Sequence, residues 1–138
     1  MFYQFKNENI NNISRITVNK DGTKLAIVAE VSPRELAQEQ LEGYNKRDID
    51  AFLKAYAKNV KVYTYPNKLS YEGIDEMRKR YAPMLKKTKD LHCKITNRIV
   101  KGNVVIDEEL VTANGRKFKA LAIYERINGK ISIVRFVR

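Results

Sequence analysis

The chain has 138 residues and a formal net charge of +11, and it contains one cysteine and one histidine. This length predicts one domain that buries about two thirds of its extended-chain surface unaided, while the single Cys93 and His92 exclude an internal disulfide and the usual Cys/His zinc sites. No apolar run approaches the roughly 20 residues of a membrane span, and MFYQFKNEN lacks the basic-then-apolar order of a secretory signal, so we expect a cytoplasmic protein without a membrane partner.

Residues 1–31 differ in composition from the rest of the chain. They contain two short β-prone runs, residues 13–18 and 24–31, which are joined by a segment with an Asp-Gly dipeptide. Such a dipeptide supplies the positive φ angles of a tight turn. We therefore expect an N-terminal extension that forms a β-hairpin added to a sheet edge or is a partly loose arm, followed by one domain over residues 32–138.

The domain begins with a helix whose start is well defined. Ser32 can cap the helix, Pro33 suits its first position, and Glu35 stands three residues after the cap to complete a capping box. The apolar spacing of three and four residues predicts a buried face made of Leu36, Ala37, Gln40, Leu41 and Tyr44. Gln40 is the polar member of this face and needs a hydrogen-bond partner there.

A second helix and a strand are predicted next. Asp48 can cap this helix, whose apolar stripe is Ile49, Phe52, Leu53 and Tyr56. The pattern then changes to strict alternation, which indicates a strand with two different faces. One face carries Val60, Val62 and Thr64, and the other carries Lys61, Tyr63 and Tyr65.

After a short polar loop, residues 74–85 predict a third helix. Asp75 and Glu76 lie in its first turn, where they favour the positive end of the helix dipole, and Pro83 predicts a kink or a new turn. Six basic residues crowd this segment: Arg78, Lys79, Arg80, Lys86, Lys87 and Lys89. Such a cluster can bind phosphates, but the patterns of an RNA-recognition module or a helix-turn-helix are missing beside it, so we interpret it as a solvated basic face and not as a specific nucleic-acid site.

The remainder of the chain has only strand patterns. Four β-prone runs are separated by Lys101-Gly102-Asn103, Asn114-Gly115 and Asn128-Gly129, and Asn-Gly is among the strongest hairpin signals. The runs are residues 91–100, 104–112, 117–127 and 131–137. Helices followed by an antiparallel meander predict an α+β domain with its helices on one face of the sheet.

Three phrases, YNKRDIDAFLKAYAKNVKVY, YEGIDEMRKRYAP and NRIVKGNVVIDEELV, occur in this order of helices and strands. In these phrases the chain resembles the nuclear transport factor 2-like superfamily, specifically the SnoaL-like group near the ketosteroid isomerases, over about residues 32–138. The resemblance implies a cone in which three helices pack on a strongly curved, mostly antiparallel sheet, with a pocket at the open end. It also implies a homodimer formed through the outer face of the sheet.

The resemblance further implies roles for single residues. The isomerases use a strand aspartate as general base, and the matching position here holds Thr64, which cannot take up a proton at neutral pH. Gln40 and Ile123 stand where the isomerases hold the oxyanion with a tyrosine and a protonated aspartate. Tyr56 and Tyr81 match the hydrogen-bonded tyrosines of the family. The usual isomerase groups are thus replaced, while the supporting tyrosines are retained.

Glu108 and His92 are the candidate acid–base residues. Glu108 interrupts an otherwise apolar strand face, and lining the pocket would raise its pKa; alternatively this face points outward and Glu108 is solvated. We expect the opposite face, with Asp107 and Glu109, to be exposed or dimer-facing. His92 could shuttle protons near neutral pH, or it is a partly exposed structural histidine on the polar side of its strand.

Two functions are compatible with these residues. The first is an isomerase, cyclase or dehydratase that binds a small apolar molecule and uses Glu108 or His92 for acid–base chemistry, with the substrate contacted by Gln40, Tyr56, Tyr63, Thr64 and Tyr81. The second is a non-catalytic dimeric ligand-binding or protein-interaction module. The chain has no convincing Gly-rich phosphate loop, metal-spaced carboxylate pair or Ser/His/Asp arrangement, so we expect neither a cofactor nor a metal.

Overall fold

The structure is a computed structural model that describes residues 13–18, 24–29 and 31–138. The chain divides into two compact units, Met1–Ser32 and Pro33–Arg138. In the first unit, β1 (Ile13–Val18) pairs antiparallel with β2 (Lys24–Ala29), as the predicted hairpin requires. The Asp-Gly turn predicted between these strands lies outside the described residues.

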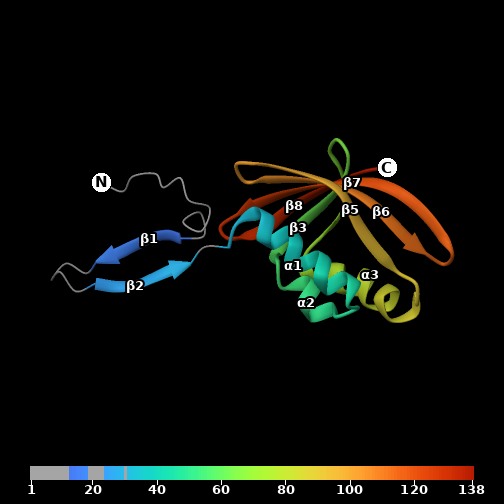
Figure 1. The fold of residues 1–138 in the computed structure, drawn as a ribbon, viewed down its shortest axis with the longest axis horizontal. Helices are drawn as coiled ribbons and strands as arrows, with labels where there is room; N and C mark the ends of the chain where they lie inside the picture. Colours follow the sequence, from blue (N-terminus) through green and yellow to red (C-terminus); the bar gives the residue numbers. More distant parts are fainter. Residues whose placement is uncertain (1–12, 19–23, 30) are drawn as a thin grey trace. The chain divides into compact units, whose positions relative to one another are not determined.

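The second unit, which the structure describes completely, contains three helices and a six-stranded sheet (Figure 1). The helices are α1 (Pro33–Asn45), α2 (Ile49–Leu53) and α3 (Ile74–Lys87). The strands are β3 (Tyr56–Thr64), β4 (Lys68–Glu72), β5 (His92–Lys101), β6 (Val104–Ala113), β7 (Arg116–Ile127) and β8 (Lys130–Val137). Their order in the sheet is β4-β3-β8-β7-β6-β5, and all neighbours are antiparallel except β3 and β8.

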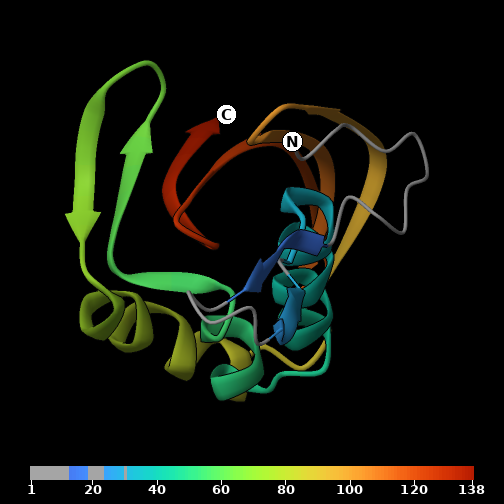
Figure 2. The same cartoon turned by 90° about the vertical axis from the view of Figure 1, so that its left-hand side faces the viewer.

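The sheet is strongly curved, and the helices lie along its concave side. Figure 2 shows the sheet curling from β3 and β4 through β8 to β5, with α1, α2 and α3 closing the open side of the arc. This arrangement confirms the predicted α+β cone. Among the described residues, no helix combines the length and the apolar character that a bilayer crossing requires.

Two predicted elements differ from those in the structure. Asp48 caps α2 by accepting a hydrogen bond from the Ala51 amide, but α2 ends at Leu53, so Tyr56 is the first residue of β3 and not the end of a helical stripe. The backbone leaves the helix because the Ile131 amide at the start of β8 donates to the Ala55 carbonyl at 2.9 Å. The segment predicted as a polar loop after β3 forms β4 instead, which pairs with β3.

The two Asn-Gly turns have the predicted geometry. Asn114 and Gly115 have φ angles of 53° and 76°, and Asn128 and Gly129 have 53° and 80°, so both central residues of each turn are left-handed. The Asp90 carboxylate holds the first turn by accepting the amides of Gly115 and Asn114, both at 2.7 Å, and these bonds lower the pKa of Asp90.

The core lies between the helices and the concave face of the sheet. The buried apolar side chains there include Leu36, Phe52, Val60, Met77, Leu85, Val105, Ile131 and Val134. Gly43 marks the closest approach of α1 to α2, because a Cβ at this position would lie 2.3 Å from the amide nitrogen of Phe52. A side chain at position 43 would therefore force the two helices apart.

The two faces of β6 are the reverse of the expected ones. Asp107 and Glu109 point inward and are buried, at 0% and 9% exposure, whereas Glu108 is exposed. The face with Glu108 has one acid and the opposite face has two, so composition alone favours burial of the face that the structure exposes. The inward orientation is stabilised by Arg98 of β5, which pairs with Asp107 and offsets part of the cost of burying its carboxylate.

Candidate functional site

A cavity of about 330 Å³ opens on the concave side of the sheet, a volume suited to a small molecule. All three helices and strands β3 to β8 contribute to its walls. Most of the lining residues are apolar or aromatic. The polar groups that face the cavity from the interior of the domain are Gln40, Cys93, Glu109 and the phenols of Tyr44, Tyr56, Tyr71, Tyr81 and Tyr124.

The structure brings together some of the predicted site residues and separates others. Gln40, Tyr56, Thr64 and Tyr81 line the cavity. The other three predicted residues, Tyr63, His92 and Glu108, do not line it.

Each of these three side chains is found elsewhere on the sheet. Tyr63 alternates with Val62 and Thr64 and lies on the outer face, where the Arg135 guanidinium is 5.3 Å from its ring centroid. Glu108 lies on the outer face of β6 and accepts a hydrogen bond from the Thr96 hydroxyl at 2.8 Å. His92 is exposed at the start of β5, opposite Thr112.

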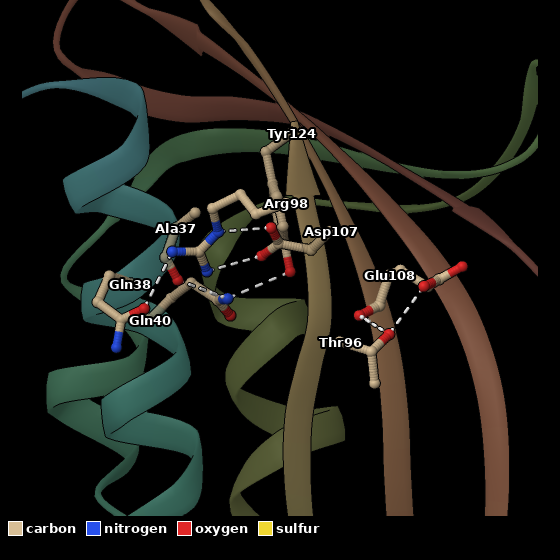
Figure 3. A network of polar contacts seen from close by, with 8 residues as sticks. All are labelled: Ala37, Gln38, Gln40, Thr96, Arg98, Asp107, Glu108 and Tyr124. Carbon is tan, nitrogen blue, oxygen red and sulfur yellow. Dashed lines mark hydrogen bonds and ion pairs between the residues drawn. The ribbon is translucent and has the colours of Figure 1, made fainter. Parts of the chain in front are cut away.

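Gln40 forms the centre of a buried polar network. Its Oε1 accepts a hydrogen bond from the Tyr56 hydroxyl at 2.9 Å, and its Nε2 donates to the Tyr124 hydroxyl at 3.2 Å and to the Ala37 carbonyl at 2.9 Å. Figure 3 shows Gln40 reaching from α1 toward Tyr124 on β7. Both ends of the buried amide are thereby satisfied, as the polar residue on the helix face required.

The network continues to Glu109. Burial, reinforced by the negative charge of nearby Asp107, raises the pKa of the Glu109 carboxyl from 4.5 to about 7, while hydrogen bonds from the side chains of Cys93 and Tyr124 counteract this rise. The donors point in one direction, from Tyr56 to Gln40, from Gln40 to Tyr124, and from Tyr124 to Glu109. Near neutral pH, Glu109 can therefore both accept and donate a proton inside the cavity.

A buried ion pair flanks the network. Arg98 binds Asp107 with two nitrogens, Nε to Oδ1 at 2.6 Å and a terminal nitrogen to Oδ2 at 2.9 Å, and its other terminal nitrogen donates to the Gln38 side chain at 3.0 Å. Figure 3 shows this pair beside Tyr124 and apart from Thr96 and Glu108. The bidentate contact holds the Asp107 carboxylate in place on the inner face of β6, the same face as Glu109.

The pairing depends on an irregularity in β5. Ile95 is opposite Glu109 and Asn97 is opposite Glu108, so Thr96 is an extra residue and forms a β-bulge. Strict alternation would place Arg98 on the polar outer side of β5 with His92. The bulge shifts the alternation by one residue and turns Arg98 toward Asp107.

Aromatic rings from the three helices and from the start of β3 form one wall of the cavity. The Phe52 ring packs against Tyr81 with a centroid separation of 4.6 Å and against Tyr56 with 5.2 Å, and Tyr44 packs at the edge of Tyr81 with 6.4 Å. Burial raises the pKa of Tyr56 and of Tyr44 above the usual value, and that of Tyr81 to about 12. These phenols therefore stay protonated near neutral pH and act as hydrogen-bond donors.

The exposed part of the cavity wall carries two cations and two hydroxyls. Arg80 and Arg138 line the cavity and are exposed. Thr64 and Ser70 face each other across the β3–β4 hairpin, with their hydroxyl oxygens 3.1 Å apart. The cavity thus combines aromatic and apolar walls with neutral hydrogen-bonding groups, one titratable carboxyl group and a cationic mouth. No cluster of three or more His, Cys, Asp or Glu side chains suitable for a metal is found within the described part of the chain.

The sequence did not single out Glu109, Tyr124 or Arg98. Ile123, assigned to an oxyanion position by resemblance, lies opposite Ile106 on the outer face of the sheet, and its neighbour Tyr124 is the residue that lies beside Gln40. A shift of one residue on β7 and the reversed faces of β6 account for two of these omissions, and the bulge at Thr96 accounts for Arg98. On β6 the sequence signal points the other way, because two acids on one strand face favour exposure of that face unless a cation pairs with them.

Comparison with known proteins agrees with this architecture. A profile of the SnoaL-like domain matches residues 37–134. A search of curated protein sequences found no match.

Several solved structures share the fold. An uncharacterised cystatin-fold protein from Novosphingobium aromaticivorans is 24% identical with a TM-score of 0.71, over 78% of this chain and 98% of that one. An NTF2-like protein of unknown function from Cytophaga hutchinsonii is 18% identical with a TM-score of 0.67, over 78% and 90%. A putative ketosteroid isomerase from Kribbella flavida is 17% identical with a TM-score of 0.63, over 76% of each chain. The solved structures share the fold of this chain, and the family profile, which covers most of its length, shows that the chain belongs to the SnoaL-like domain family.

Proposed function

We propose that the cone binds a small, mainly apolar molecule and that Glu109 transfers a proton to or from it, as an isomerase, cyclase or dehydratase does. The observation that carries this proposal is the Glu109 carboxyl group, which lines the cavity and has a pKa raised to about 7. A group whose pKa lies near the working pH is present as both acid and base, which is the condition for efficient proton transfer.

The surrounding residues have complementary parts in this proposal. Glu109 would take a proton from a carbon next to a carbonyl group and return it to another position of the same molecule. The Tyr81 hydroxyl, protonated and at the cavity wall, would donate to the oxygen on which negative charge develops. Tyr56, Gln40 and Tyr124 would hold the carboxylate in place through their directed hydrogen bonds.

The remaining predicted contact is Thr64, whose hydroxyl would meet the part of the substrate nearest the mouth. The reassignment of the acid–base role from Glu108 and His92 to Glu109 follows from position alone, because the first two side chains lie outside the cavity wall.

The test compares Glu109→Gln with Glu108→Gln, which removes the adjacent carboxylate on the outer face. Small cyclic ketones and enones are incubated with each protein in D₂O, and deuterium incorporation at the carbon next to the carbonyl is followed by NMR. We expect wild type and Glu108→Gln to exchange the same substrates at equal rates. Glu109→Gln should be slower by about 10²-fold to 10⁴-fold, the usual contribution of a general acid or base.

Retention of full exchange activity in Glu109→Gln would show that this carboxyl group is not the base. If wild type exchanges none of the compounds, yet an apolar probe binds in the cavity, the domain is a binding module and not an enzyme for this class of reaction.

A further inference from the structure

We propose that the ligand of the cone is an amphipathic organic acid, whose apolar body fills the cavity and whose anionic group binds Arg80 and Arg138 at the mouth. This inference rests on the proposed function in one respect, that the cavity is the ligand site, and it adds the chemical class of the ligand.

Both guanidinium groups are held against aromatic rings at the cavity wall. The central guanidinium carbon of Arg80 lies 4.3 Å from the ring centroid of Tyr71, and that of Arg138 lies 4.9 Å from the centroid of Phe136. All four of these residues line the cavity. Stacking restricts a long side chain before any ligand arrives, so less conformational entropy is lost when a ligand binds.

The donors of Arg80 are only partly used. Its ion pair with Glu76, one helical turn earlier on α3, engages Nε at 3.1 Å. Within the described part of the chain, this pair leaves both terminal nitrogens of Arg80 for a ligand. A guanidinium presents its nitrogens as a planar fork that matches the oxygens of a carboxylate, sulfonate or phosphate group.

The charge balance of the cavity wall favours an anion. The cavity lining contains Arg80, Arg138 and one carboxyl group, Glu109, which is partly protonated near neutral pH; Glu76, the ion-pair partner of Arg80, does not line the cavity. The positive charges are confined to the exposed part of the wall, while the interior carries apolar side chains, neutral polar groups and Glu109. An anionic group bound at the mouth keeps part of its hydration and avoids the desolvation cost that it would meet deeper in the cone.

The experiment uses two fluorescent probes with one aromatic skeleton. The probe 8-anilinonaphthalene-1-sulfonate carries an anionic group, and N-phenyl-1-naphthylamine is its neutral counterpart. We expect wild type to bind the sulfonate more tightly. The double variant Arg80→Gln/Arg138→Gln should bind the sulfonate roughly tenfold more weakly, as expected for losing charge-assisted hydrogen bonds at an exposed site, and should bind the neutral probe unchanged.

A charge-matched control separates a local contact from the general positive field. The double variant Lys79→Gln/Lys101→Gln removes two exposed cations that do not line the cavity, and it should bind both probes like wild type. Equal loss of sulfonate binding in the two double variants would overturn the proposal. Equal affinity of wild type for the sulfonate and the neutral probe would overturn it too.

The position of the probes distinguishes failure of this inference from failure of the proposed function. Amide NMR shifts of Val111 and Ala120 should move with either probe, because both residues line the cavity. If the neutral probe changes these shifts, and the affinity for the sulfonate does not depend on the two arginines, the cavity binds neutral molecules. In that case the proposal of an organic acid as ligand fails and the proposed function stands. If neither probe moves them, the cavity is not the binding site and both proposals fail.

Discussion

The folded protein stabilises the protonated form of the Glu109 carboxyl group. Its carboxyl group is buried against the cavity wall and has Asp107 two residues away on the same strand face. Both effects disfavour the carboxylate, so the folded state binds the proton more tightly than the unfolded state does between the ordinary pKa of 4.5 and the raised pKa of about 7. The carboxyl group thus has a cost in folding stability at the pH values at which its proton-transfer function would be used.

The consequence for stability can be measured. As pH rises through this window, the free energy of unfolding of the wild type should fall relative to that of Glu109→Gln, by up to about 3 kcal/mol. The reason for the difference is that the amide introduced by this substitution carries no charge at any of these pH values. Urea unfolding at several pH values from about 4 to about 8 tests this expectation. Glu108→Gln serves as control and should follow wild type; a parallel course of all three curves would contradict the burial of the Glu109 charge.

At the level of single residues, the sequence was sufficient where the chemistry of one position is decisive. Gln40 on an apolar helix face predicted a buried amide with partners, and the structure supplies Tyr56 and Tyr124. It was insufficient at Glu108 and Glu109, where the strand face with more acids is the buried one. Which acid points inward is decided by a cation on the neighbouring strand, and that pairing is visible only in three dimensions.

Helix packing at Gly43 is the clearest constraint at the level of elements. Gly43→Ala would place a methyl group 2.3 Å from the Phe52 amide nitrogen and 2.6 Å from its Cα, and these are backbone atoms that cannot rotate away. Alanine gains up to about 1 kcal/mol in helix propensity, but the overlap should outweigh it, and we expect a net loss of about 2 kcal/mol in unfolding free energy. Urea unfolding measures it, with the exposed Glu42→Ala on the same helix as control. A stabilised Gly43→Ala variant would mean that α1 and α2 are not in contact at this point.

Most elements follow from local patterns because capping boxes, helical stripes and Asn-Gly turns are encoded by neighbouring residues. The exceptions involve partners distant in sequence. β4 exists because β3 offers it an edge, and α2 is short because β8 pairs with the residue that precedes β3. Pro83 lies inside α3, which continues to Lys87; its exposed position means that the missing amide donor is lost at the solvent side of the helix.

At the level of the whole molecule, the net charge of +11 affects the attraction of anions more than it affects folding stability. The basic side chains of and after α3 are exposed, as a solvated face requires, and two of them form ion pairs, Arg78 with Asp50 and Arg80 with Glu76. Such exposed pairs contribute little to stability. Their main effect is a positive field around the cone, which raises the local concentration of anions whatever their identity.

We propose, from the family resemblance, that two copies of the chain associate through the outer face of the sheet. Ile99, Ile106 and Ile123 lie side by side across β5, β6 and β7 on this face, and Ile99 is 55% exposed. Replacing Ile123 with Glu should convert a dimer into a monomer in sedimentation equilibrium, whereas Lys79→Glu on α3 should leave the dimer intact. A monomeric wild type at micromolar concentration would contradict the proposal.

The bulge at Thr96 has a consequence for how this sheet can vary. Since Thr96 is the extra residue, a chain without it would still pair Ile95 with Glu109 and Arg98 with Asp107, and no side chain would change sides. The losses would be the local bend that a bulge imposes on its strand and the hydrogen bonds of the Thr96 hydroxyl to Glu108 on the outer face. At this position the shape of the cone can therefore change without a change in which residues face its interior. Deleting Thr96 should alter the width of the opening and leave the side chains that line the cavity the same.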